Sequence, residues 1–137
     1  MSSIGFGNVT VDTKLEKKQY RQGEEITGIV EVRGGEVEQD IEGIVLTLIV
    51  KYEQDKEDSD FSYHEREIQE IILDKVQHID SREISSQTFT MQLTKDHPVT
   101  TEKMETILRT KLIVPQAVDP EEEDQVVIIS HDQETAL

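Results

Sequence analysis

The stretch Ile26-Thr27-Gly28-Ile29-Val30-Glu31-Val32 repeats its small and apolar side chains with a period of two residues. Successive side chains of a β-strand point to opposite faces, so this period gathers one set of residues on one face. We therefore predict a strand that turns one face to a hydrophobic core, the face that carries Ile26, Gly28, Val30 and Val32.

On either side of this stretch, further strand patterns are separated by turn residues. Gly23-Glu24-Glu25 is expected to turn the chain before it, and Gly34-Gly35 after it, because paired glycines readily adopt the positive φ of a tight connection. Residues 41–52 carry apolar side chains on both faces, which predicts a strand covered at least partly on both sides. Strand patterns occupy residues 9–15, 26–32, 41–52, 85–93, 107–114 and 126–129. Their spacing, with Pro98 and Pro115 as interruptions, predicts an all-β fold: an antiparallel β-sandwich.

Residues 65–79 fit two structures. Ile68, Ile71 and Ile72 have the three- and four-residue spacing of an amphipathic helix, and the Glu, Gln, Leu and Lys around them favour one. Phe61 and Tyr63, just upstream, have the spacing of a strand, and every neighbouring pattern is a strand. The residues alone leave helix and strand open.

The composition gives a formal net charge of −16, from 14 Lys and Arg against 30 Asp and Glu in 137 residues. Nucleic acids and anionic membranes bind clustered Lys and Arg, so we expect neither as a partner. Most of the charge lies in two segments. Residues 53–70 hold eight acids against two bases, and residues 119–137 hold seven acids and no base. We expect residues 53–60 to form an acidic loop at a hairpin tip.

The metal-ligating residues are few and scattered. Without Cys there is neither a disulfide nor a thiolate metal site, and a zinc site needs three or four convergent ligands. We therefore predict that all four histidines are exposed surface residues: His64, His78, His97 and His131.

The acidic residues 55–60 do not match a calcium-binding EF-hand. A loop that starts at Asp58 places Tyr63 where Gly is required and Gln69 where a bidentate Glu is required. We expect no metal site, with one alternative. The acidic loops 55–60 and 119–124 could bind a divalent ion weakly, with Asp58 and Asp60 as candidate ligands.

The sequence contains no nucleophile elbow, no phosphate-binding loop and no dinucleotide fingerprint, so we expect a protein that is not an enzyme and uses no cofactor. Residues 1–8 lack the basic and apolar regions of a signal peptide, and no apolar run approaches the ~20 residues that span a bilayer. A cytoplasmic location is expected. We predict that residues 1–8 form a flexible lead-in and residues 131–137 a disordered tail, although Thr135-Ala136-Leu137 has the form of a C-terminal peptide ligand.

The first third of the chain resembles the bacterial stage-zero sporulation protein M (SpoOM) family. The residues that carry the resemblance are Val11-Asp12-Thr13-Lys14-Leu15-Glu16-Lys17, Tyr20, Gly23-Glu24, Gly28, Val30, Val32, Gly34-Gly35, Gln39, Ile41, Ile44, Leu46 and Leu48, and it resumes at Leu112 with Ala117-Val118-Asp119-Pro120. Gln22 stands where the family usually has Pro, which leaves the turn feasible.

Members of this family are similar to arrestins, with two immunoglobulin-like β-sandwich domains in tandem. The resemblance implies that residues 9–130 form the arrestin-like N-terminal domain. It also favours strand over helix for residues 65–73. The function it implies is that of a non-catalytic adaptor, which regulates sporulation or a related cell-cycle process by binding other proteins.

Strand edges accept partner strands, so the apolar run at residues 126–129 is predicted to be either such an edge or a buried last strand. Its members are the interaction candidates Val126, Val127, Ile128 and Ile129. If a second domain normally covers part of this one, homodimerisation would hide the surface left exposed. The alternative function is a β-sandwich that binds a divalent ion or another ligand through the acidic loops 55–60 and 119–124.

Overall fold

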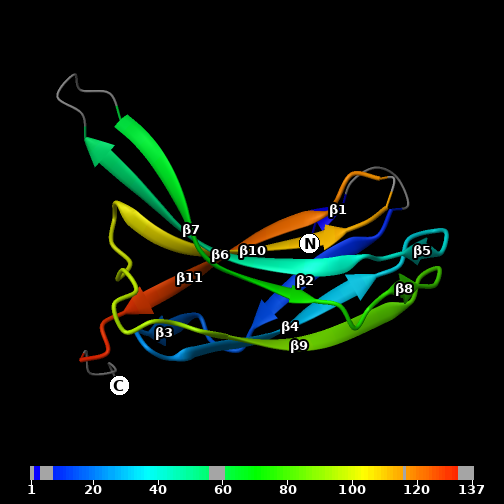
Figure 1. Ribbon diagram of the computed structural model, residues 1–137, viewed down its shortest axis with the longest axis horizontal. Coiled ribbons are helices and arrows are strands. Elements are labelled where there is room, and N and C mark those ends of the chain that lie inside the picture. The colour runs from blue at the N-terminus through cyan, green and yellow to red at the C-terminus, as the bar shows by residue number, and fades with distance from the viewer. Residues whose placement is uncertain (1, 4–7, 56–60, 116, 133–137) are drawn as a thin grey trace.

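The structure is a computed structural model that describes residues 2–3, 8–55, 61–115 and 117–132 (Figure 1). Within these residues every regular element is a β-strand, which confirms the all-β prediction. A four-stranded sheet has the order β1 (Ser2–Ser3), β2 (Thr10–Leu15), β4 (Glu25–Arg33) and β9 (Ile84–Gln92). A five-stranded sheet has the order β3 (Gln19–Arg21), β11 (Glu121–Ile129), β10 (Met104–Ile113), β6 (Gly43–Asp55) and β7 (Phe61–Leu73).

The two sheets share one hydrophobic core. Along β4 the buried residues are Ile26, Gly28, Val30 and Val32, as the two-residue period predicts. The five-stranded sheet contributes Leu46, Leu48, Leu108, Leu112, Val126 and Ile128 to the same cluster. A short ribbon of β5 (Gln39–Asp40) and β8 (His78–Ile79) lies at one end of the sandwich (Figure 1). All pairings are antiparallel except that of β3 with β11.

Strand β7 confirms the strand alternative for residues 65–73. The register with β6 shifts beside Ile49, which faces Glu67 while Leu48 faces Gln69, so Ile68 is an extra residue. This bulge reverses the alternation and lets both Ile68 and Ile71 pack against the core. The helical spacing therefore comes from a bulged strand, and Ile72 is exposed rather than part of an apolar helix face.

Three local predictions differ from the structure. Residues 53–55 belong to β6 rather than to a loop, because they pair with residues 61–63 of β7. Glu121 to Asp124, expected in an acidic loop, form the first part of β11. Ser2–Ser3, assigned to a flexible lead-in, pair with Val11 and Thr10 of β2. In each case partner strands supply backbone hydrogen bonds that outweigh the weak strand preference of the polar side chains. Of the tail predicted at residues 131–137, His131 and Asp132 are described and lie in a turn, and residues 133–137 lie outside the described residues.

Of the two alternatives for residues 126–129, the structure shows the buried last strand. Val126 and Ile128 are completely buried. Residues 127–129 pair with β3 on one side of β11, and β10 pairs with residues 121–126 on the other. Beyond β10, Thr100 hydrogen-bonds to both backbone groups of Ile128, so the backbone of this segment is occupied on both sides. The interaction candidates Val126 and Ile128 therefore lie in the core, while Val127 and Ile129 are partly exposed on the opposite face.

Candidate functional site

Strand β9 forms an open edge of the four-stranded sheet. It pairs with β4 along its whole length, and no other described strand pairs with its opposite side (Figure 1). Its nine residues, Ile84–Gln92, include no charged side chain and no proline. Natural sheet edges usually carry charges, proline or bulges that prevent pairing with another chain. The β9 edge lacks these features.

Hydrogen-bond directions show which β9 residues face the open side. On the β4 side, Leu93 N donates to Glu24 O over 3.0 Å, and Glu83 O accepts from Gly34 N over 2.7 Å. The N–H and C=O groups of successive strand residues point to alternate sides, so the even-numbered residues 84–92 direct theirs away from β4. Thr88 lies at the centre of this set with an exposed side chain.

The free edge of the other large sheet differs in character. Strand β7 carries Glu65, Arg66, Glu67 and Glu70, and it has a bulge at Ile68. Charges and bulges of this kind discourage edge-to-edge pairing. Of the two long free edges, β9 is therefore the better site for an added strand.

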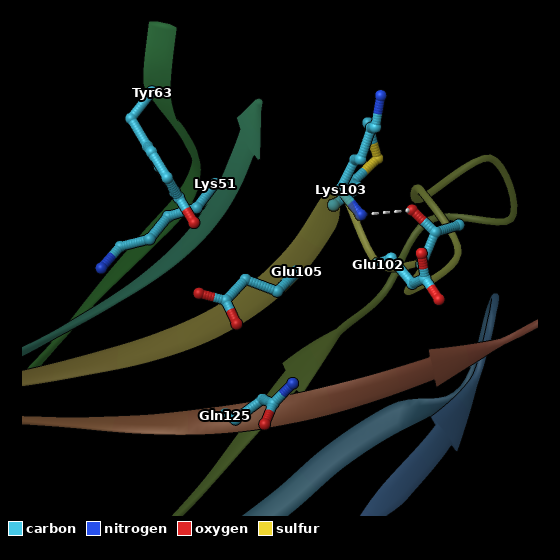
Figure 2. Close-up of a pocket in the computed structure, with 8 residues that line it drawn as sticks. Lys51, Tyr63, Glu102, Lys103, Glu105 and Gln125 are labelled. Carbon is cyan, nitrogen blue, oxygen red and sulfur yellow. Dashed lines mark hydrogen bonds between the residues drawn. The ribbon is translucent and has the colours of Figure 1, made fainter. Parts of the chain in front are cut away.

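A second surface feature is a hollow of about 230 Å³ on the outer face of the five-stranded sheet (Figure 2). Lys51 and Glu105 lie on neighbouring strands on its floor, and Tyr63 of β7, 69% exposed, stands beside it. Its other lining residues are Thr101, Glu102, Lys103, Met104 and Gln125. The lining contains side chains of both charge signs, without a grouping of catalytic residue types.

Basic side chains on this outer face neutralise much of the acidic run in β11. Arg109 lies 2.7 Å from Glu123 and 3.3 Å from Glu121, and Lys51 lies 3.3 Å from Glu123. Burial alone would raise the pKa of the Glu123 carboxyl, but hydrogen bonds from Arg109 and Lys51 lower it below its usual value. The outward carboxylates of β11 are thus paired with cations, which leaves them poorly suited to hold the divalent ion of the alternative considered for residues 119–124. Asp58 and Asp60, the candidate ligands of the other acidic segment, lie outside the described residues.

The inward carboxylates of β11 form a different cluster. Glu122 accepts a hydrogen bond from Thr13 N over 2.8 Å, at the point where β2 of the other sheet approaches β11. Asp124 Oδ2 is buried with no hydrogen-bond partner in the described structure. The pKa of Asp124 is raised to about 7, chiefly by burial. The hydrogen bond with Glu122 and the negative charges of Glu122 and Asp12 contribute to the same shift.

This shift predicts a pH dependence of stability. The folded protein retains a proton on Asp124 that the unfolded chain, with a pKa near 3.8, has already released, so stability is lost as the pH rises from about 4 through about 7. Asp124→Asn removes the charge and is expected to stabilise the protein at pH 8 by about 1–2 kcal/mol, allowing for solvent screening, with little change at pH 4. Urea unfolding at both pH values measures this. The control Asp132→Asn removes an exposed charge, and an equal gain from it would contradict the local origin of the effect.

The histidines do not all lie on the surface. His97 is 2% exposed, its Nε2 lies 2.8 Å from Thr106 Oγ1, and burial lowers its pKa. The prediction of an exposed side chain is wrong here, because the loop between β9 and β10 places His97 against Thr106 of β10. His64 stacks on Tyr52 with ring centroids 5.2 Å apart, and His131 is exposed beside Asp132.

His78 is exposed among three carboxylates. Its Nδ1 lies 2.8 Å from Asp40 Oδ1, and its Nε2 lies 3.2 Å from Asp80 and 3.6 Å from Glu38. The spacing of the histidines in the sequence does not predict this group, because its other three members are acidic residues. The available signal was the pair of alternating motifs Glu38-Gln39-Asp40 and His78-Ile79-Asp80, but only the pairing of β5 with β8 brings them together.

Comparisons with known proteins agree with one another. A family model described as "SpoOM protein" matches residues 1–137. The sporulation-control protein spo0M of Bacillus subtilis (strain 168) is 33% identical over 130 residues, which are 95% of this chain and 50% of that protein. The crystal structure of Spo0M from Bacillus subtilis superposes with a TM-score of 0.84 at 32% identity, over 92% of this chain and 51% of that one. The chain thus spans about half the length of these relatives. Among the described residues, no helix is long and apolar enough to cross a membrane.

Proposed function

The chain belongs to the SpoOM protein family, and we propose that it acts in the control of sporulation as a non-catalytic adaptor that binds other proteins in the cytoplasm. The family supports the connection with sporulation. The absence of catalytic motifs in the sequence supports a binding role over a chemical one. Binding by an adaptor requires a surface that a partner can recognise.

The open β9 edge is the observation that carries the proposal. It offers a row of backbone N–H and C=O groups over nine residues without a charge, and an extended partner segment can pair with such a row. At the centre of the row the exposed side chains, Ser86, Thr88 and Thr90, are small and polar, so they leave room for an incoming strand. We infer that the partner contributes an extended, largely uncharged strand.

The test changes the backbone of the edge and leaves its side chains nearly intact. Thr88→Pro removes an N–H that points away from β4, so the ladder between β4 and β9 is retained while an added strand loses a hydrogen bond. Thr88→Val keeps the N–H and the branched shape and serves as the matched control. In a crosslinking pull-down from sporulating cells, we expect the chain and Thr88→Val to recover the same partner. We expect Thr88→Pro to recover about tenfold less or none, because losing about 1.4 kcal/mol of binding free energy weakens the affinity tenfold.

Two further measurements make the result decisive. Far-UV circular dichroism must show that Thr88→Pro is folded, and sedimentation must show whether a second copy of the chain is the partner. A dimer that Thr88→Pro dissociates would identify the added strand as β9 of another copy. Equal recovery of the partner by Thr88→Pro and Thr88→Val would contradict binding through this edge.

A further inference from the structure

The ribbon of β5 and β8 presents four polar side chains on one face. Asp40 and His78 are directly paired across the ribbon. Glu38 lies two residues before Asp40, just ahead of β5, and Asp80 lies two residues after His78, just past β8. Residues two apart in an extended chain point to the same side, and the carboxylates of Glu38, Asp40 and Asp80 all reach the His78 ring. Ile79, between His78 and Asp80, points the other way and is completely buried. We propose that Glu38, His78 and Asp80 bind a divalent transition-metal ion, with Asp40 orienting the imidazole.

The distances between the donor atoms fit tetrahedral coordination. Ligand atoms about 2.0–2.2 Å from a tetrahedral zinc ion lie roughly 3.3–3.6 Å from one another. His78 Nε2 lies 3.2 Å from Asp80 Oδ1 and 3.6 Å from Glu38 Oε2. All three donor atoms lie within 4.8 Å of one another. Small side-chain rotations would complete three corners of a tetrahedron, with the fourth left for water.

The surroundings of His78 select the nitrogen that binds. Nδ1–H donates to Asp40 Oδ1 over 2.8 Å, while Nε2 faces the carboxylates of Asp80 and Glu38. A metal ion that displaces the Nε2 proton therefore finds the Nε2 lone pair directed at these two carboxylates. A carboxylate that fixes a ligand histidine in this way is the usual outer partner in zinc sites. One imidazole with two carboxylates suits zinc and its neighbours, whereas calcium and magnesium prefer oxygen ligands alone.

The two strands are held together by contacts outside the group of ligands. Ser81 Oγ donates to Glu36 O over 2.8 Å, and Arg82 N donates to Gly35 O over 3.0 Å. Backbone hydrogen bonds from Gly34 N to Glu83 O and from Ile41 N to Gln77 O, of 2.7 and 2.9 Å, bracket the ribbon. The ligands therefore start from a fixed spacing, which lowers the entropy cost of binding an ion.

The charge of the group also favours a cation. Within the described part of the chain, the ion pairs of Glu38, Asp40 and Asp80 are all made with His78. One imidazole cannot balance three carboxylates, so negative charge remains at the centre of the group. A divalent ion would neutralise it while using the same imidazole as a ligand.

Calorimetric titration of the chain with Zn²⁺ tests the proposal. We expect saturable binding of one ion, no comparable heat with Ca²⁺, loss of the saturable binding in His78→Gln, and about tenfold weaker binding in Asp40→Asn. His131→Gln is the matched control, because His131 is an exposed histidine beside a single carboxylate, 2.9 Å from Asp132. It is expected to bind Zn²⁺ like the parent.

Nuclear magnetic resonance of the histidine ring nitrogens adds a readout of geometry. Zn²⁺ should shift the Nε2 signal of His78 while its Nδ1 keeps its proton. Unchanged binding by His78→Gln, or equal losses in His78→Gln and His131→Gln, would overturn the proposal. So would coordination through Nδ1. None of these outcomes bears on the β9 edge, which lies on other residues.

Discussion

Replacing Ile128 by Ala is expected to lower the free energy of unfolding by about 3–4 kcal/mol. The Ile128 side chain is completely buried in the core shared by the two sheets, so its removal forfeits apolar burial and leaves a cavity. Its strand is held on both sides, by β10 and β3, and its backbone N donates to Thr100 Oγ1 over 2.8 Å. This framework limits how far the site can collapse around the smaller side chain. Urea unfolding monitored by circular dichroism measures the loss.

Val127→Ala in the same strand is the matched control. Val127 faces away from the core and is partly exposed, so we expect its substitution to cost less than about 1 kcal/mol. Similar losses of unfolding free energy in the two variants would contradict the structure, in which Ile128 lies on the buried face of β11 and Val127 on the partly exposed face. A small loss in Ile128→Ala alone would mean that residues 126–129 are not anchored in the core.

Alternation along a single strand was sufficient to predict which residues are buried. The inward face of β4 matches the prediction residue by residue, because a two-residue period depends only on local geometry. β7 shows the limit of this approach. Its bulge at Ile68 depends on the register with β6, which no pattern within residues 65–73 contains. The family resemblance favoured the strand there, and the residues alone did not.

The candidate sites depend on pairing between distant segments. The sequence shows that residues 84–92 are uncharged, but their status as an edge follows from the order of strands in the sheet. The group around His78 requires that β5 and β8 pair across 37 intervening residues. The sequence pattern predicts a strand at residues 126–129, but only the structure shows that β3 pairs with this strand and so occupies one of its edges. Local patterns predict elements well and their neighbours poorly.

Gly34 illustrates a correct boundary with a different physical cause. The strand β4 ends at Arg33, immediately before Gly34-Gly35, as predicted. The expected reason was a positive φ, but among the described glycines only Gly23 adopts one, at 82°. At Gly34 the reason is a close approach. A Cβ atom there would lie 2.1 Å from the carbonyl oxygen of Asp80 and 3.0 Å from the backbone nitrogen of Arg82.

Gly34→Ala is accordingly expected to destabilise the protein by about 2–3 kcal/mol, because the three nearest atoms that a methyl group would meet, in Asp80, Arg82 and Glu83, all belong to the backbone. None can rotate away, so the chain at residues 80–83 must move and strain the hydrogen bond from Gly34 N to Glu83 O. The lower entropy of the unfolded alanine chain offsets less than about 1 kcal/mol of this cost. Gly43→Ala is the matched control, since its Cβ would meet Ile72 and Leu73 at 3.6 Å, an ordinary van der Waals contact. In thermal unfolding we expect a clear decrease of Tm for Gly34→Ala and little change for Gly43→Ala. If both variants melt like the parent, the segments 33–35 and 80–83 are not packed as closely as the structure shows.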